Sequence, residues 1–239
     1  MLTAITVLTA LIGLLVSPIL VAVSVRVFEP TALVSRSDFD RPLRLPQDVD
    51  TTDLAAWKLP TTMVISTVVS GAMVQAIGLR WVLPAYLWFV AITIVLSLTD
   101  VDRKLIPNRV LYPATFIGAV LLAAGALADW DLSSLLRGFA GAAAYFVFLY
   151  LVYVVARGGF GFGDVKLGLF IGLFAAYLGW AALFISVVAA FIIGAMVSVV
   201  LLVFRVKGRK DPIPFGPYMV GAAYIAMVWH EPIREWYGV

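Results

Sequence analysis

Residues 182–203, ALFISVVAAFIIGAMVSVVLLV, form a run of 22 residues without a charged side chain. An α-helix needs about 20 apolar residues to cross the hydrocarbon core of a bilayer, so this run predicts a transmembrane helix. The whole chain has the same character, with 239 residues, 63% of them hydrophobic and 13% charged, and a mean hydropathy of +1.03. Soluble domains carry about 25% charged residues. We therefore predict an integral membrane protein of the all-α class.

Similar apolar segments recur along the chain. They lie at about 2–25, 61–79, 81–99, 111–128, 136–156, 166–180, 182–203 and 216–230. They predict one polytopic bundle of about eight transmembrane helices. No basic residue precedes the first segment, and Arg26 follows it, so we interpret this segment as an uncleaved anchor rather than a secretory signal. We assign residues 1–60 to this anchor and a following loop, and residues 61–239 to the main membrane domain.

The distribution of Lys and Arg predicts the orientation. With the N-terminus outside, all Lys and Arg except Arg80, Arg137 and Arg234 lie on the cytoplasmic side, which is 14 of the 17. The positive-inside rule favours this orientation. Aromatic side chains at the outer ends of the spans agree with it: Trp81, Trp130, Trp180, Trp229 and Trp236. The basic residues of the last cytoplasmic loop are expected to contact anionic lipid: Arg205, Lys207, Arg209 and Lys210.

The composition also excludes several kinds of site. There is no cysteine, so disulfides, thiol catalysis and CxxC metal sites are excluded, and the one histidine, His230, is predicted at the outer surface. We predict no metal, no cofactor and no nucleic-acid partner. The one long hydrophilic stretch, 29–60, has too few apolar residues for a core of its own and is predicted to be a cytoplasmic loop of little fold.

Three acids stand out at the cytoplasmic ends of the predicted spans: Asp100, Asp102 and Asp164. An ionised carboxylate in hydrocarbon is costly and is retained with a partner or a function. Two carboxylates a few ångströms apart can share one proton, activate a water as base and protonate a leaving amine as acid. The alternative is that each acid ends a helix in water, with Asp164 capping a helix that starts at Val165 and pairing with Lys166.

The glycines before Asp164 favour the functional interpretation. The stretch GGFGFGD, residues 158–164, predicts a broken segment against a wet cleft, because non-helical backbone at membrane depth needs protein or water beside it. Such an edge could hold an extended peptide by main-chain hydrogen bonds. A plain turn is the alternative.

The other acidic stretch contains Pro107, which restricts Ile106 to extended geometry. We therefore predict that one span ends at Asp100 and that the next begins near Arg109. Asp100 and Asp102 are two residues apart and do not share a helical face, so at most one of them should meet Asp164. The small-residue patterns GFAG, 138–141, and GLFIG, 168–172, predict close helix packing.

Three motifs together resemble the type IV prepilin peptidases, the GxGD class of intramembrane aspartic proteases. They are TDVDRKLIPN at 99–108, GFGDVK at 161–166 and IPFGPY at 213–218. Their order, their spacing and the eight predicted spans match that family, over about residues 61–230.

The resemblance implies an inner-membrane enzyme that cuts the short basic leader from prepilins or pseudopilins at the cytoplasmic face, just before their hydrophobic stalk. It implies that Asp100 and Asp164 are the catalytic acids. The matched motifs supply the candidates for substrate binding: Gly161, Gly163, Lys166, Pro107, Asn108, Asp102, Pro214 and Gly216. Larger members carry a domain with paired CxxC motifs between the first two spans and are associated with N-methylation. This interval is free of cysteine here, so we expect peptidase activity without N-methyltransferase activity.

Two other functions are compatible with buried acids and broken helices. One is a proton- or cation-coupled transporter, and the other is an inactive scaffold in pilus assembly. Transport sites tend to lie near mid-membrane, whereas these three acids cluster at one face, which favours proteolysis. The sequence makes no prediction of the individual substrate or of the oligomeric state.

Overall fold

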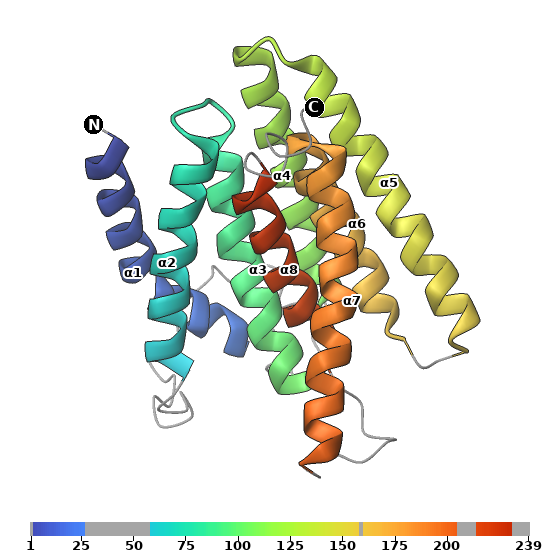
Figure 1. Cartoon of the computed structure of the whole chain (residues 1–239). Coiled ribbons are helices and arrows are strands. Elements are labelled where there is room, and N and C mark those ends of the chain that lie inside the picture. Colours follow the sequence, from blue (N-terminus) through green and yellow to red (C-terminus); the bar gives the residue numbers. More distant parts are fainter. Residues whose placement is uncertain (1, 27–57, 158–159, 205–213, 231–239) are drawn as a thin grey trace, which may run out of the picture.

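The computed structural model of the chain describes residues 2–26, 58–157, 160–204 and 214–230. Within these residues all regular structure is helical, in the order α1 (Leu2–Arg26), α2 (Lys58–Ile77), α3 (Leu83–Arg103), α4 (Asn108–Ala128), α5 (Leu132–Val155), α6 (Phe162–Leu178), α7 (Trp180–Val203) and α8 (Gly216–Val228). Figure 1 shows them as one bundle, with α8 beside α3 and α7. The predicted all-α class and the eight helices are confirmed for the described part of the chain.

Five of these helices are long and apolar enough to cross a membrane. They are α2 from Pro60 onward, α3, α4, α5 and α7, and shorter apolar helices cover Ile5–Val21 and Gly216–Val228. The outer surfaces of the long helices carry exposed large apolar side chains, such as Phe116 on α4 and Phe184 on α7. An apolar exterior suits a lipid environment, so the chain is a multi-pass membrane protein.

Helix α1 packs against α2 at the edge of the bundle. Pro18 lies inside α1, and Figure 1 shows this helix changing direction along its length. Proline removes a backbone donor and clashes with the preceding turn, which explains the bend. The two helices approach closely at Gly13, where the Ser66 hydroxyl donates to the Gly13 carbonyl over 2.8 Å. A Cβ at Gly13 would lie 2.8 Å from the Ser66 carbonyl oxygen, so a glycine is needed at this contact.

The close packing predicted from GFAG and GLFIG is confirmed between α5 and α6. A Cβ at Gly141 would come within 2.1 Å of the Ala176 Cβ, and one at Gly172 within 2.7 Å of the Gly141 carbonyl oxygen. Most of α6 is buried, because α4, α5, α7 and α8 all pack around it. Aromatic rings fill the contact between α3 and α6, with the centroid of Phe89 4.8 Å from that of Phe174. The least polar part of the chain therefore surrounds the helix that begins with the GxGD motif.

The end of the bundle opposite Asp100 is held by ionic contacts. The Arg80 guanidinium lies 3.4 Å from the carboxylates of Asp129 and Asp131. Asp131 caps α5 by accepting a hydrogen bond from the Ser134 backbone N–H over 3.1 Å. Arg137 donates to the carbonyls of Ala176 and Tyr177 at the end of α6, over 2.7 and 2.6 Å. This end of the bundle is closed by ion pairs and helix caps.

The tryptophans and the histidine at the same end can now be compared with expectation. Four of the predicted outer tryptophans are exposed: Trp81, Trp130, Trp180 and Trp229. His230 is buried rather than on the surface, because its Nδ1 lies 2.6 Å from the Met227 carbonyl oxygen. Trp236, the hydrophilic loop over 29–57 and the basic residues of 205–210 lie outside the described residues.

Candidate active site

Asp100 lies in the last turn of α3, which confirms its predicted place at the end of this span, and α4 begins at Asn108, beside the predicted Arg109. Helix α3 continues to Arg103, and Asp100 is only 4% exposed. Lys104 then adopts the left-handed conformation, with φ of 54°, and its N–H bonds to the Asp100 carbonyl over 2.8 Å. The helix extends past Asp100 because Pro107 restricts only the residues next to it. Asp100 is thereby held on a rigid element.

Asp164 lies in the first turn of α6, and it does not cap the helix as the alternative proposed. Helix α6 begins at Phe162, with Gly161 as its N-cap in an extended conformation, and Asp164 is 8% exposed. Gly163, expected in a broken segment, is helical, so the described non-helical part of this motif is 160–161. A Cβ at Gly161 would lie 2.9 Å from Asp164 Oδ2. Glycine at 161 therefore leaves room for the carboxylate.

The start of α8 is bonded to Asp100 and approaches α6, the helix that carries Asp164. The Gly216 backbone N–H donates to Asp100 Oδ2 over 3.0 Å. A Cβ at Gly216 would lie 2.7 Å from that oxygen and 3.5 Å from Leu167 Cδ2 on α6. Leu167 follows Asp164 by three residues on α6, so the start of α8 packs against the first turns of the helix that carries Asp164. Three motifs that are distant in the sequence thus converge at the end of the bundle opposite the Arg80 ion pairs; because we predict that it faces the cytoplasm, we call it the inner end and the opposite one the outer end.

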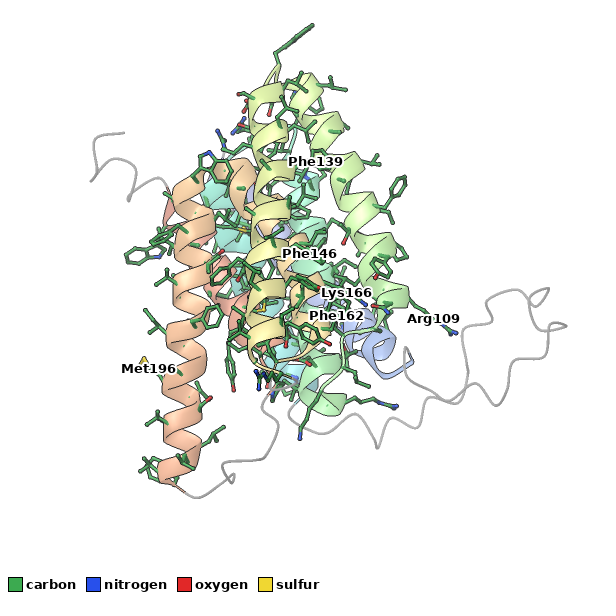
Figure 2. The ribbon with its side chains drawn as sticks, turned by 90° about the vertical axis from the view of Figure 1, so that its right-hand side faces the viewer. Arg109, Phe139, Phe146, Phe162, Lys166 and Met196 are labelled. Carbon is green, nitrogen blue, oxygen red and sulfur yellow. The ribbon has the colours of Figure 1, made fainter. Side chains whose placement is uncertain are left out.

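Neither carboxylate has a basic partner among the described residues. Lys166, which was considered as a partner of Asp164, instead donates from Nζ to Asn108 Oδ1 over 3.0 Å. Its ammonium also lies over the rings of Phe162 and Tyr112, 4.8 and 5.5 Å from their centroids. Figure 2 shows Lys166 next to Phe162, whereas Arg109 points away from the bundle. Lys166 therefore joins α6 to α4 rather than neutralising an acid.

Two of the remaining predicted residues, Pro107 and Asn108, lie at the start of α4. Pro107 is the extended N-cap of α4, and Asn108 is the first residue of that helix. This segment packs against the GxGD motif, because a Cβ at Gly163 would lie 3.2 Å from the Ile106 Cβ.

The other two candidates lie less close to the acids. Pro214 is partly buried just before α8. Asp102 is exposed, and at two residues from Asp100 it lies about 200° around the helix, so it does not join the pair.

Two tyrosines near the acids were not predicted. Tyr145 on α5 packs against α6 one turn after Asp164, because a Cβ at Gly168 would lie 3.5 Å from its Cδ2, and Tyr218 follows Gly216 by two residues on α8. The Tyr145 hydroxyl is buried and has no hydrogen-bond partner in the described part of the chain. Tyr218 belongs to the IPFGPY motif, so its position was open to prediction. Tyr145 lies outside every motif, and its position depends on how α5 packs against α6.

The chemistry available at this junction is that of a carboxylate pair. No cluster of three or more His, Cys, Asp and Glu side chains that could hold a metal ion occurs within the residues described. Two buried acids at one end of the bundle can share one proton, so that one accepts a proton while the other donates one. This arrangement can carry out acid–base catalysis on a water molecule.

Comparison with known proteins identifies related sequences. Residues 87–199 match the model of the type IV leader peptidase family. The chain is 29% identical over 185 residues to the prepilin leader peptidase/N-methyltransferase of Aeromonas hydrophila, covering 75% of this chain and 61% of that protein. It is 30% identical over 174 residues to the protein of the same name from Bacillus subtilis, covering 71% and 66%.

A third relative with that name, from Pseudomonas aeruginosa, is 28% identical over 180 residues, covering 75% of this chain and 61% of the relative. The chain therefore spans about three fifths of the length of the first curated relatives that it matches. No solved structure matches it.

Proposed function

We propose that this chain, which belongs to the type IV leader peptidase family through residues 87–199, is a membrane aspartic endopeptidase that removes the leader of prepilins or pseudopilins. The observation that carries the proposal is that Asp100 and Asp164, two buried acids from separate motifs, both lie where the start of α8 meets α3 and α6: Gly216 donates to Asp100 and approaches Leu167 of α6. The relatives' names, prepilin leader peptidase/N-methyltransferase, support the substrate class.

The two acids divide the work of hydrolysis. A backbone donor stabilises a negative charge, so the Gly216 N–H suits Asp100 to be the ionised member, with the proton on Asp164. Asp100 takes a proton from a water whose oxygen bonds to the scissile carbonyl carbon, and Asp164 protonates the carbonyl oxygen. The C–N bond then breaks as a proton passes from the pair to the leaving amine. The products are a carboxyl group and a free amine.

The GxGD motif contributes space for the substrate backbone. Gly161 is extended immediately before α6 and has no side chain to crowd Asp164. An extended peptide can approach such an edge and form main-chain hydrogen bonds. Gly161 and Gly216 thus leave room for the two buried carboxylates, whereas Gly163 allows the Ile106 segment to pack close by. Pro107, Asn108 and Lys166 would then position the entry to the site rather than contact the scissile bond.

The site would face the cytoplasm from the inner membrane. Both acids lie at the end of the bundle opposite the exposed tryptophans Trp81 and Trp130 and the Arg80 ion pairs. The positive-inside distribution supports the same orientation. The position of both acids at one end of the bundle also argues against an ion transporter, whose ion-binding sites tend to lie near mid-membrane.

Peptidase activity without N-methyltransferase activity is our second proposal. It rests on the absence of cysteine from the interval between the first two helices. An interaction of the basic leader with the acids of the loop remains a prediction about residues outside the described part of the chain: Glu29, Asp38, Asp40, Asp48, Asp50 and Asp53.

Cleavage of a co-expressed prepilin-like substrate tests the proposal. Asp100→Asn and Asp164→Asn should each reduce leader removal by at least about 100-fold, because each removes an acid–base group. Asp102→Asn is the matched control and should cut at the wild-type rate, since Asp102 is exposed and away from the pair. All variants are compared at equal membrane levels.

The opposite pattern would overturn the peptidase assignment. Continued cleavage by both Asp100→Asn and Asp164→Asn would show that the pair is not the catalyst. Failure of the wild-type protein on a panel of prepilins and pseudopilins would favour an assembly scaffold. Mass spectrometry of the trimmed product reports the second proposal, because N-methylation adds a defined mass to its new amino terminus.

A further inference from the structure

A cleft between α2, α3 and α8 lies next to Asp100, and the proposed hydrolysis does not yet make use of it. Its volume is about 280 Å³. Its lining on two helices repeats at i, i+3, i+4 and i+7, from Ile94 to Val101 on α3 and from Pro217 to Tyr224 on α8. This repeat is that of one helix face, so the cleft runs along both helices. Thr61, Thr62 and Ile65 of α2 form its third wall.

The cleft and the acid pair share the same two helices. Ser97 lines the cleft one turn before Asp100, which is about 4.5 Å along the helix axis. Pro217, on the α8 wall, follows directly after Gly216, whose N–H donates to Asp100. An extended peptide advances about 3.3 Å per residue. If a substrate peptide bond is held at Asp100, the side chain one or two residues further along the substrate therefore reaches the cleft.

The side chains of the cleft favour a peptide over a lipid chain as its occupant. The Ser97 hydroxyl is buried and lacks a hydrogen-bond partner among the described residues. Thr93 and Thr99 on the same helix donate to carbonyls of their own helix, over 2.7 and 2.9 Å, as hydroxyls in helices commonly do. A peptide main chain offers Ser97 a carbonyl or an N–H, whereas an acyl chain offers neither.

The size and direction of the cleft specify the occupant further. A cavity of about 150 Å³ accepts benzene, so this cleft has room for one large apolar side chain. It extends from Val101, next to Asp100, to Tyr224, whose hydroxyl is hydrogen-bonded to Thr93 further into the bundle. An occupant that starts at the acids therefore continues toward the membrane interior. In the proposed substrate, the apolar segment after the cut has this direction.

We propose that the cleft between α2, α3 and α8 is the subsite for the first large apolar side chain after the cleaved bond, with Ser97 bonding the adjacent peptide main chain. This inference rests on the proposed peptidase function and adds a specificity determinant to it. The same cleft sets the register of cleavage, because seating this side chain fixes which peptide bond lies at Asp100 and Asp164.

Gly221 provides a direct way to fill the cleft. It lines the α8 wall, and a Cβ at this position would meet no atom within 4 Å. Gly221→Leu therefore adds a side chain to open space without a clash. Ala144→Leu is the matched control, because it adds similar bulk at an exposed position on α5. Both full-length variants are assayed in liposomes on two substrates, with Phe or Ala as the first residue after the cut.

The expected result is a change in preference. Wild-type protein and Ala144→Leu should cut the Phe substrate more efficiently than the Ala substrate. Gly221→Leu should lose about 10- to 100-fold in kcat/KM on the Phe substrate and much less on the Ala substrate, since a filled apolar pocket rejects the larger side chain. Ser97→Ala should raise KM about two- to tenfold on both substrates through one lost hydrogen bond.

Equal effects of Gly221→Leu on the two substrates would overturn the subsite. No effect at all would do the same and would favour a lipid-filled cleft or an unused space. A binding measurement separates this failure from that of the peptidase assignment: the Asp100→Asn protein is photocrosslinked to a substrate with benzoylphenylalanine after the cut. Crosslinks to the cleft-lining residues of α2, α3 or α8 support the subsite even without cleavage, and crosslinks confined to other helices contradict it.

Discussion

Acids at the two ends of the bundle differ in their partners. At the outer end, Asp129 and Asp131 are partly exposed and each lies 3.4 Å from Arg80. At the inner end, Asp100 and Asp164 are buried, and no described cation pairs with either. A buried unpaired carboxylate is expensive unless it is protonated or hydrogen-bonded. The difference separates acids that hold helices together from the two acids that we propose to be catalytic.

The ends of α6 differ in the same way. At its outer end, Arg137 donates to two carbonyls and so anchors the helix by charge. At its inner end, α6 is positioned by close contacts at Gly161 and Gly163, and Lys166 bonds to Asn108. Glycine at 161 leaves room for the Asp164 carboxylate, which a larger side chain would displace. One end of α6 is therefore positioned by close packing at glycines and the other by a charged side chain.

The largest effect should come from adding one methyl group at the inner end. In Gly216→Ala, the new Cβ would lie 2.7 Å from Asp100 Oδ2, so the carboxylate or the start of α8 must move. A misplacement of about 1 Å in a catalytic group can cost about 100-fold in rate. We expect leader cleavage to fall by at least about tenfold, measured as initial rates in membranes with equal protein levels.

Gly71→Ala is the control for the added methyl group. Its Cβ would lie 3.6 Å from Thr6 Cγ2, an ordinary contact between α1 and α2, so cleavage should stay at the wild-type rate. Thermal unfolding in detergent should show that Gly216→Ala remains folded. Wild-type cleavage by a folded Gly216→Ala protein would contradict the role of this contact in holding Asp100.

A second change tests the outer end through stability rather than activity. Arg80→Gln removes the cation beside Asp129 and Asp131, and we expect it to lower the free energy of unfolding by about 1 kcal/mol. Leader cleavage at a temperature where the variant is folded should be unchanged. Unfolding is followed by circular dichroism during denaturant titration in micelles, with Arg109→Gln, an exposed arginine of the inner end, as the control for stability.

Loss of cleavage in Arg80→Gln at unchanged stability would contradict the division between the two ends. It would mean that the outer ion pairs act on the acids through the bundle. Equal losses of stability in Arg80→Gln and Arg109→Gln would show instead that the outer pairs contribute nothing beyond the removal of a surface charge.

The sequence predicted the helices well because hydrophobic length determines them. The eight apolar segments correspond to α1–α8, and the patterns around Gly141 and Gly172 marked the tight contact of α5 with α6. Helix ends at the site were predicted less well. Glycine disfavours helix, yet Gly163 is helical because tertiary packing against Ile106 outweighs its low propensity.

The residues of the candidate site could be predicted from the sequence, but the contacts between them could not. Asp100, Asp164 and Gly216 were named from motifs, whereas the hydrogen bond from Gly216 to Asp100 depends on how α8 packs against α3. The alternative interpretation paired Lys166 with Asp164 from proximity in sequence, but the side chain turns to Asn108 and two aromatic rings. Side-chain partners across helices follow from the fold, which no local pattern contains.

The smallest expected effect tests whether the charge of Asp131 stabilises the outer end. Burial alone would raise the pKa of Asp131, but hydrogen bonds from Ser134, Ser133 and Arg80 outweigh it and hold this pKa below its usual value. A lowered folded-state pKa contributes stability that is present above the unfolded value of about 3.9 and is lost as pH falls through the folded value. The wild type should therefore lose stability relative to Asp131→Asn only below about pH 4.

Melting temperatures of the two proteins in detergent between about pH 3 and pH 7 measure this difference. The effect should be small, because Asp131 is partly solvated and solvent screens its interactions. Ser133→Ala removes a donor that lies 3.0 Å from Asp131 Oδ1. It should therefore reduce the difference in the pH dependence of melting temperature that the Asp131 charge produces. Parallel curves for the wild type and Asp131→Asn over this whole range would show that the Asp131 charge does not stabilise the outer end, and its helix cap alone would then explain its position.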